Sequence, residues 1–257
     1  MLDPLESSPA AAAPVADARR AAAGRLVAHP RLTAALEVIL CSGIPTQLAI
    51  AALLVLAGWA PAPGDPPNIL FVVTLLLADT CAVTALMAFF MWAHGERART
   101  VWLGSRPVAR EALLGLALVP TVFLMVVVLL NTLRLVAPWL HNVPVNPFEA
   151  MAGESSINAA ILGVAAIVAG GVREELQRAF LLHRFEQHLG GAAVGVVVLS
   201  LAFGLAHVDQ GRDAMITTGV LGLFWAMVYL RRRSSVAPLV SHAGFNSLEL
   251  LRVAIAG

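Results

Sequence analysis

The stretch "GGVREELQRAF", residues 170–180, places Arg173, Glu174, Glu175, Gln177 and Arg178 in one short run between apolar residues. Residues three or four positions apart share a helix face, so Arg178 can pair with either glutamate. One such pair leaves a second carboxylate over. A carboxylate is expensive at membrane depth and marks a functional site there, so the interpretation depends on where this run lies.

The composition places this run in a membrane protein. The chain has 257 residues, of which 59% are hydrophobic and 13% are charged. These are too few polar side chains to cover a soluble protein of this size. We therefore expect an all-α, polytopic integral membrane protein with about seven transmembrane helices, since each span needs about 20 mostly apolar residues. The expected spans are residues 32–60, 68–93, 112–140, 157–182, 191–206, 214–230 and 236–256.

The distribution of polar residues divides the chain into three parts. Residues 1–31 lack the apolar core of a signal peptide and are expected to form a disordered cytoplasmic tail. Residues 32–140 are expected to form three accessory transmembrane helices. Within them Asp79 is an isolated carboxylate near mid-span, which needs a partner. Residues 157–256 carry most of the polar residues at membrane depth, so any chemistry is expected in this helical core, around a polar cavity.

Arginine sets the expected orientation, because the chain contains no lysine. Arginines cluster in residues 19–31, 97–110 and 231–233, whereas the loops at 61–67 and 141–156 contain none. The positive-inside rule then predicts a multi-pass protein of the cell membrane with a cytoplasmic N-terminus. The net charge is +1, and the basic residues form loop clusters rather than a stripe, so no nucleic-acid partner is expected.

Two further motifs carry polar residues into apolar helices. In "AFGLAHVDQG", residues 202–211, Phe203 and His207 lie one helical turn apart, and the ring can support the imidazole. In "VSHAGFNSLEL", residues 240–250, His242 and Asn246 share one helix face. Either histidine alone is more often a satisfied core residue than a catalyst. The two histidines are considered together because both are expected at the same depth in the membrane.

The pair Gly190 and Gly191 predicts the turn of a helical hairpin. Glu174 and His207 are equidistant from this turn, so they should face each other across the two helices. His242 lies nine residues beyond Arg233, roughly 13 Å inside the boundary, and Glu174 lies at a comparable roughly 15 Å. The motifs are therefore expected to meet in the cytoplasmic half of the membrane.

These residues resemble the signature of the type II CAAX prenyl protease and bacteriocin-processing group of intramembrane peptidases, also called CPBP or Abi proteins. That signature is a glutamate pair followed by an arginine, then FxxxH, then HxxxN on successive spans. The matching residues are Glu174, Glu175, Arg178, Phe203, His207, His242 and Asn246. The resemblance covers about residues 160–250, and the three elements in order are specific, although each alone is weak.

The resemblance implies a role for each matching residue. Glu174 would be the general base that takes a proton from water, and His207 would help to hold that water. His242 and Asn246 would donate to the oxyanion formed when water attacks a peptide carbonyl. Glu175 would be a supporting carboxylate.

One departure from the family pattern concerns the arginine. The family usually has it four residues after the second glutamate, where this chain has Ala179. Arg178 is one residue earlier, which turns it about 100° around the helix. It can still pair with Glu174, but it does not stand at the family arginine's position. Arg178 and Phe203 are therefore assigned as supporting residues.

No cofactor is required by this mechanism. The sequence contains no HExxH, GxSG or GxGD motif of other protease classes. A zinc site built from Glu174, His207 and His242 stays open on ligand type alone, with metal as the less favoured option.

The expected function is therefore an intramembrane endopeptidase that hydrolyses a membrane-associated or lipid-modified protein or peptide, with its active site open to the cytoplasm. The Ala- and Arg-rich composition suggests a GC-rich bacterial genome. The alternative is a non-catalytic membrane scaffold or bacteriocin-immunity-type protein that binds a peptide or partner in the same cavity. A proton-coupled transporter is a weaker third option, because the two halves of the chain show no similarity.

Overall fold

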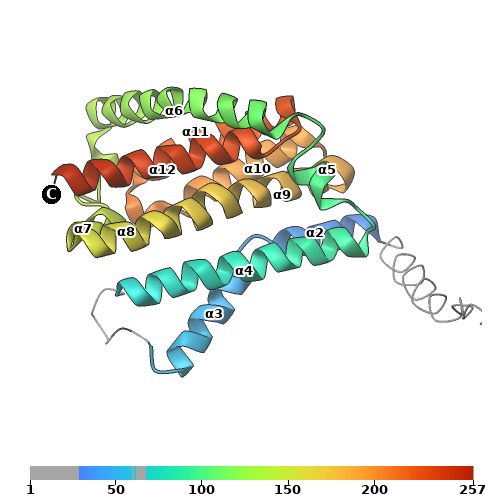
Figure 1. Cartoon of the computed structure of the whole chain (residues 1–257), viewed down its shortest axis with the longest axis horizontal. Helices are drawn as coiled ribbons and strands as arrows, with labels where there is room; N and C mark the ends of the chain where they lie inside the picture. The colour runs from blue at the N-terminus through green and yellow to red at the C-terminus, as the bar shows by residue number, and fades with distance from the viewer. Residues whose placement is uncertain (1–28, 60, 62–67, 257) are drawn as a thin grey trace, which may run out of the picture.

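The computed structural model describes residues 29–59, 61 and 68–256, and every regular element in this part of the chain is a helix. The predicted all-α class is therefore confirmed. Most of the predicted tail, residues 1–28, lies outside the described residues, whereas Pro30 and Arg31 already belong to the first described helix. Figure 1 shows the helices as stacked rods, in the order α6, α12, α8–α9 and α4.

The elements have the following bounds: α2 Pro30–Leu40, α3 Ile44–Leu56, α4 Ile69–Ala93, α5 Ala98–Trp102, α6 Val108–Val136, η2 Pro138–Leu140, α7 Pro147–Gly153, α8 Ser156–Ala165, η3 Ala166–Arg173, α9 Glu174–His188, α10 Ala192–Leu205, η4 Val208–Gln210, α11 Arg212–Arg232 and α12 Val236–Ala256.

Among the described residues, four helices are long and apolar enough to cross a membrane: α4, α6, the continuous helix of residues 156–188, and α11. The pair α2 and α3 makes a fifth span if it is counted as one helix bent by 41°. The expected count of seven is not confirmed. The 14 residues of α10 reach only about 21 Å at 1.5 Å per residue. The last helix, α12, is long enough but carries polar side chains along its length.

The bend between α2 and α3 is held by Asp79 of α4, which is fully buried. The Arg173 guanidinium lies 3.2 Å from its carboxylate and also donates to Gln177 at 2.9 Å. Gln177 in turn donates to the backbone oxygen of Cys41 at the end of α2, at 2.5 Å. Gly43 has φ +89° and begins α3. Asp79, which was expected to need a partner, thus has Arg173 as its partner. Through Arg173 and Gln177, the bend between α2 and α3 is connected to the helix that carries the glutamate pair.

A second ionic cluster ties α9 to the N-terminal helices. Arg184 bonds to the buried carboxylate of Glu37 in α2, and His94 lies 2.5 Å from the same carboxylate. Arg184 also donates to Glu96 at 2.8 Å, and His183 lies 3.0 Å from it. Burial alone would raise the pKa of Glu96, but the bonds from His183 and Arg184 outweigh it and lower the pKa to about 2. Glu96 therefore stays ionised, and α9 is anchored at both of its ends.

Glycines permit the turn at the end of α9 and a close helix contact beside the glutamate pair. Gly190 and Gly191 form the predicted hairpin turn between α9 and α10, with φ of +97° and +91°. Gly171 in η3 packs directly on α12, where a Cβ atom would lie 2.6 Å from the Cβ of Ala243. This distance is too short for any side chain, so η3 and α12 approach as closely as two helices can.

We expect Gly171→Ala to lower the thermal unfolding temperature in detergent, because overpacking of a filled core costs about 1–3 kcal/mol. The matched control is Gly153→Ala at the end of α7, where a Cβ atom would meet nothing within 4 Å. Equal unfolding temperatures for the two variants would contradict the close contact between η3 and α12.

Candidate active site

Glu175 is the centre of the polar cluster in the C-terminal half. Its side chain is 1% exposed, and its Oε1 accepts bonds from Arg178 Nη1 and from His242 Nδ1, the latter at 2.9 Å. A guanidinium is always charged and a carboxylate only accepts, so the geometry requires the proton on Nδ1 of His242. One carboxylate thus joins α9 to α12 and fixes the imidazole.

Glu174 lies beside this cluster in a different environment. Its side chain is 18% exposed, and its Oε2 lies 4.0 Å from Nε2 of His242. Within residues 29–59, 61 and 68–256, no hydrogen bond to the Glu174 side chain is found. The two neighbouring glutamates therefore divide into a buried, hydrogen-bonded carboxylate and a partly open one, whose ion pair with His242 is longer, at 4.0 Å. The second carboxylate of the run at residues 170–180 is therefore not part of the ion pair with Arg178.

Arg178 selects Glu175 rather than Glu174. The sequence allows either pairing, and in the structure the ion pair is with Glu175. The guanidinium carbon also lies 4.6 Å from the centroid of the Phe203 ring, a cation–π contact that connects α9 to α10. Arg178 is 5% exposed, so its charge is compensated inside the bundle.

The Phe203 and His207 rings are in contact, as predicted, at 4.9 Å between centroids and 60° between planes. Nδ1 of His207 lies 2.8 Å from the Phe203 carbonyl oxygen, which only accepts, so Nδ1 carries the proton and Nε2 is left as an acceptor. In the described part of the chain, no hydrogen bond or ion pair joins His207 to Glu174, and the expectation that they face each other across the hairpin stays a prediction. Phe203 links His207 to the cluster instead, with its centroid 6.1 Å from that of His242.

Asn246 lies one turn beyond His242 on α12, as expected. One hydrogen of its Nδ2 donates to the backbone oxygen of Ala166 at 3.2 Å, which leaves the second available. Ala166 begins η3, a π-helical segment that ends directly before Glu174. Such segments are rare and occur frequently at functional sites. A Cβ atom at Gly170 would lie 2.7 Å from Nδ2 of Asn246, so only glycine allows this approach.

Sequence reasoning missed one residue of the cluster, Trp225 of α11. Its ring stacks on His242 at 3.9 Å between centroids and 16° between planes. The residue lies in the apolar run "VLGLFWAMVYL", residues 220–230, where an aromatic side chain predicts only core packing. The run contains no polar spacing that could have identified it.

The zinc alternative does not fit the donor set. Nowhere in residues 29–59, 61 and 68–256 do three His, Cys, Asp or Glu side chains converge as a metal site would require. Nδ1 of His242 is held by Glu175, and His207 is separated from His242 by the Phe203 ring. We therefore derive no chemical step through a metal.

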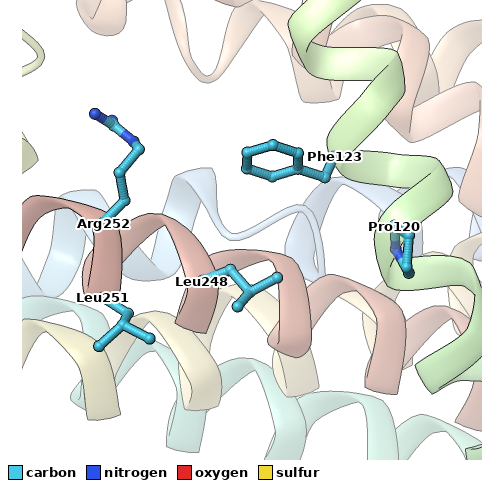
Figure 2. A pocket seen from close by; sticks show the side chains of 5 residues that line it. All are labelled: Pro120, Phe123, Leu248, Leu251 and Arg252. Atoms are coloured by element: carbon cyan, nitrogen blue, oxygen red, sulfur yellow. The ribbon is translucent and has the colours of Figure 1, made fainter.

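An open groove between α6 and α12 lies apart from this cluster (Figure 2). It is lined by Pro120, Phe123, Leu248, Leu251 and Arg252. Its lining is mostly apolar and includes no residue of the cluster, so it is not the polar cavity expected from the sequence. That cavity stays a prediction.

Comparison with known proteins agrees with the motifs. Residues 156–248 match the family model described as type II CAAX prenyl endopeptidase Rce1-like, and this segment contains all the predicted site residues. No curated protein and no solved structure matches the chain.

We expect Glu175→Gln to destabilise the protein by about 3–5 kcal/mol, because removing one partner of a buried ion pair leaves Arg178 uncompensated. Glu174→Gln is the matched control, since its carboxylate has no close partner to lose. Thermal unfolding of both variants in the same detergent measures the difference. Equal stabilities would show that Glu175 does not compensate the buried charge.

Proposed function

Because residues 156–248 match the family model of type II CAAX prenyl endopeptidases, we propose that the protein is an intramembrane endopeptidase in which Glu174 activates water. The observation that carries this proposal is that the two adjacent carboxylates differ in burial and in hydrogen bonding. Glu175 is occupied by Arg178 and His242, whereas Glu174 is partly open and faces Nε2 of His242 at 4.0 Å. Two carboxylates in different environments are typical of an acid–base site.

In the proposed reaction, Glu174 takes a proton from water, and the resulting hydroxide attacks the carbonyl carbon of a peptide bond. The carbonyl oxygen becomes an oxyanion. Protonated Glu174 then gives its proton to the leaving nitrogen as the carbon–nitrogen bond breaks. The 4.0 Å separation of Glu174 Oε2 and His242 Nε2 suits a water that bonds to both.

The oxyanion needs donors, and α12 can supply two. Asn246 retains one free amide hydrogen after bonding to Ala166. His242 already donates through Nδ1, so it can donate to the oxyanion through Nε2 only as an imidazolium. His207 presents its Nε2 acceptor from the end of α10 and is proposed to help to hold the water or the peptide.

The substrate is proposed to be a membrane-associated or lipid-modified protein or peptide, because the glutamate pair lies near the middle of a 33-residue apolar helix. The family assignment and the apolar helices support a multi-pass membrane protein. Its placement in the cell membrane, with a cytoplasmic N-terminus and a cytoplasmic opening of the site, is proposed from the arginine distribution.

Purified protein in lipid nanodiscs is expected to cut at least one of a panel of membrane peptides, with and without a lipid-modified cysteine. Glu174→Gln should lower turnover by about 10²–10⁴-fold, the usual contribution of a general base, without loss of folding. Glu186→Gln, on the same helix but paired with the exposed Arg233, is the matched control. Mass spectrometry of the products measures both rates. Equal cutting by wild type and Glu174→Gln would overturn the proposal, and the scaffold alternative requires no cutting by either.

A chelator is expected to leave the cleavage rate unchanged, because the donor set does not converge on a metal position. The check is the same peptide assay after prolonged incubation with a chelator, followed by buffer exchange. A loss of activity that added zinc restores would contradict this prediction.

A further inference from the structure

Trp225 and His242 form the closest ring contact at the proposed site. Their centroids are 3.9 Å apart with planes 16° from parallel, and the two residues are 1% and 5% exposed. The Phe203 ring meets the imidazole nearly perpendicularly, at 86° and 6.1 Å. One flat face of the imidazole is thus covered by the indole, while its Nδ1 edge is held by Glu175.

The indole is itself fixed by the helix that carries the histidine. Nε1 of Trp225 donates to Oγ of Ser241 at 3.0 Å, and this hydroxyl donates to the backbone oxygen of Pro238 at 2.9 Å. Ser241 immediately precedes His242. The ring of α11 is therefore oriented by the same helical turn whose imidazole it covers.

We propose that Trp225 is a positioning residue of the peptidase reaction, which holds the imidazole plane of His242 so that Nε2 faces Glu174. This inference rests on the proposed function. Glu175 fixes only the Nδ1 atom of His242, and a ring held at one atom can still tilt about that bond. Stacking removes this freedom, because tilting the imidazole would lift it from the indole face.

The indole face also favours the charge that the reaction requires. Nε2 of His242 donates to the oxyanion only when the ring is an imidazolium, and an indole is the strongest cation–π partner among the side chains. Arg178 is as buried as His242, but its guanidinium carbon lies farther away, 5.7 Å from the Trp225 centroid. The closer contact is the one with His242.

A purely structural role for Trp225 is the competing explanation, because the residue also packs in a buried cluster with Val122 and Leu221. Leu221 lies one turn earlier on α11 and has no ring contact with His242. Leu221→Ala therefore opens a cavity in the same cluster without removing the stacked ring. It is the matched control for Trp225→Leu.

We expect Trp225→Leu to lower kcat by about 10- to 30-fold with KM changed by less than about 3-fold, as loss of a desolvated cation–π contact implies. Trp225→Phe, which keeps an aromatic face, should recover most of kcat. Leu221→Ala should unfold at a lower temperature and keep kcat near that of wild type. Equal losses of kcat in Trp225→Leu and Leu221→Ala would overturn the proposal.

A second readout needs no substrate. In spectra of the full chain with ¹⁵N-labelled histidine, the His242 signal is identified by its loss in His242→Gln. This signal should shift or broaden in Trp225→Leu and stay in place in Leu221→Ala. An unmoved signal in Trp225→Leu would overturn the positioning role, even if no peptide is cut. Should Trp225→Leu not fold, Ser241→Ala decides, because it keeps the indole and removes the bond that orients it, together with the hydroxyl's own bond to the Pro238 backbone oxygen. It should lower kcat by about 5-fold, the usual net value of one hydrogen bond, and an unchanged kcat would overturn the proposal.

Discussion

The carboxylate of Glu175 is the interaction on which the arrangement of the C-terminal helices depends. A buried anion is tolerated only where cations and hydrogen bonds compensate it, and here Arg178 and His242 both converge on one oxygen. Because these partners come from α9 and α12, their attraction fixes the distance and the rotation of one helix against the other. Among the described residues, the adjacent Glu174 makes no hydrogen bond through its side chain and lies 4.0 Å from Nε2 of His242, which is why it is the carboxylate proposed to react.

The surrounding structure keeps this pairing in place from several directions. Asp79 of α4 holds Arg173, the residue just before the glutamate pair, and Glu37 holds Arg184 ten residues after Glu174. Gly171 lets η3 lie directly on α12, where Asn246 bonds to the start of the π-helical segment. The N-terminal helices, which carry none of the motifs, thus position the helix that carries the acids.

The sequence predicted the helical class and one turn better than the ends of the helices. Composition predicts the all-α class, and the glycine pair at 190–191 predicts the hairpin turn that the structure contains. The predicted span 157–182 is shorter than the helix, which runs from Ser156 to His188. Arg184 lies in the added part, where Glu37 and Glu96 compensate its charge. Such compensation comes from residues far away in the chain, which local patterns do not reveal.

The candidate site shows the same limit. Helical spacing predicts that His242 and Asn246 share a face, but not that Arg178 selects Glu175 or that Trp225 stacks on the imidazole. Both depend on packing between helices.

The most direct test of the account is a double-mutant cycle on thermal unfolding, with Glu175→Gln, His242→Gln and the double variant. The account predicts a coupling free energy of about 1–3 kcal/mol between the two side chains, and additive effects would contradict it.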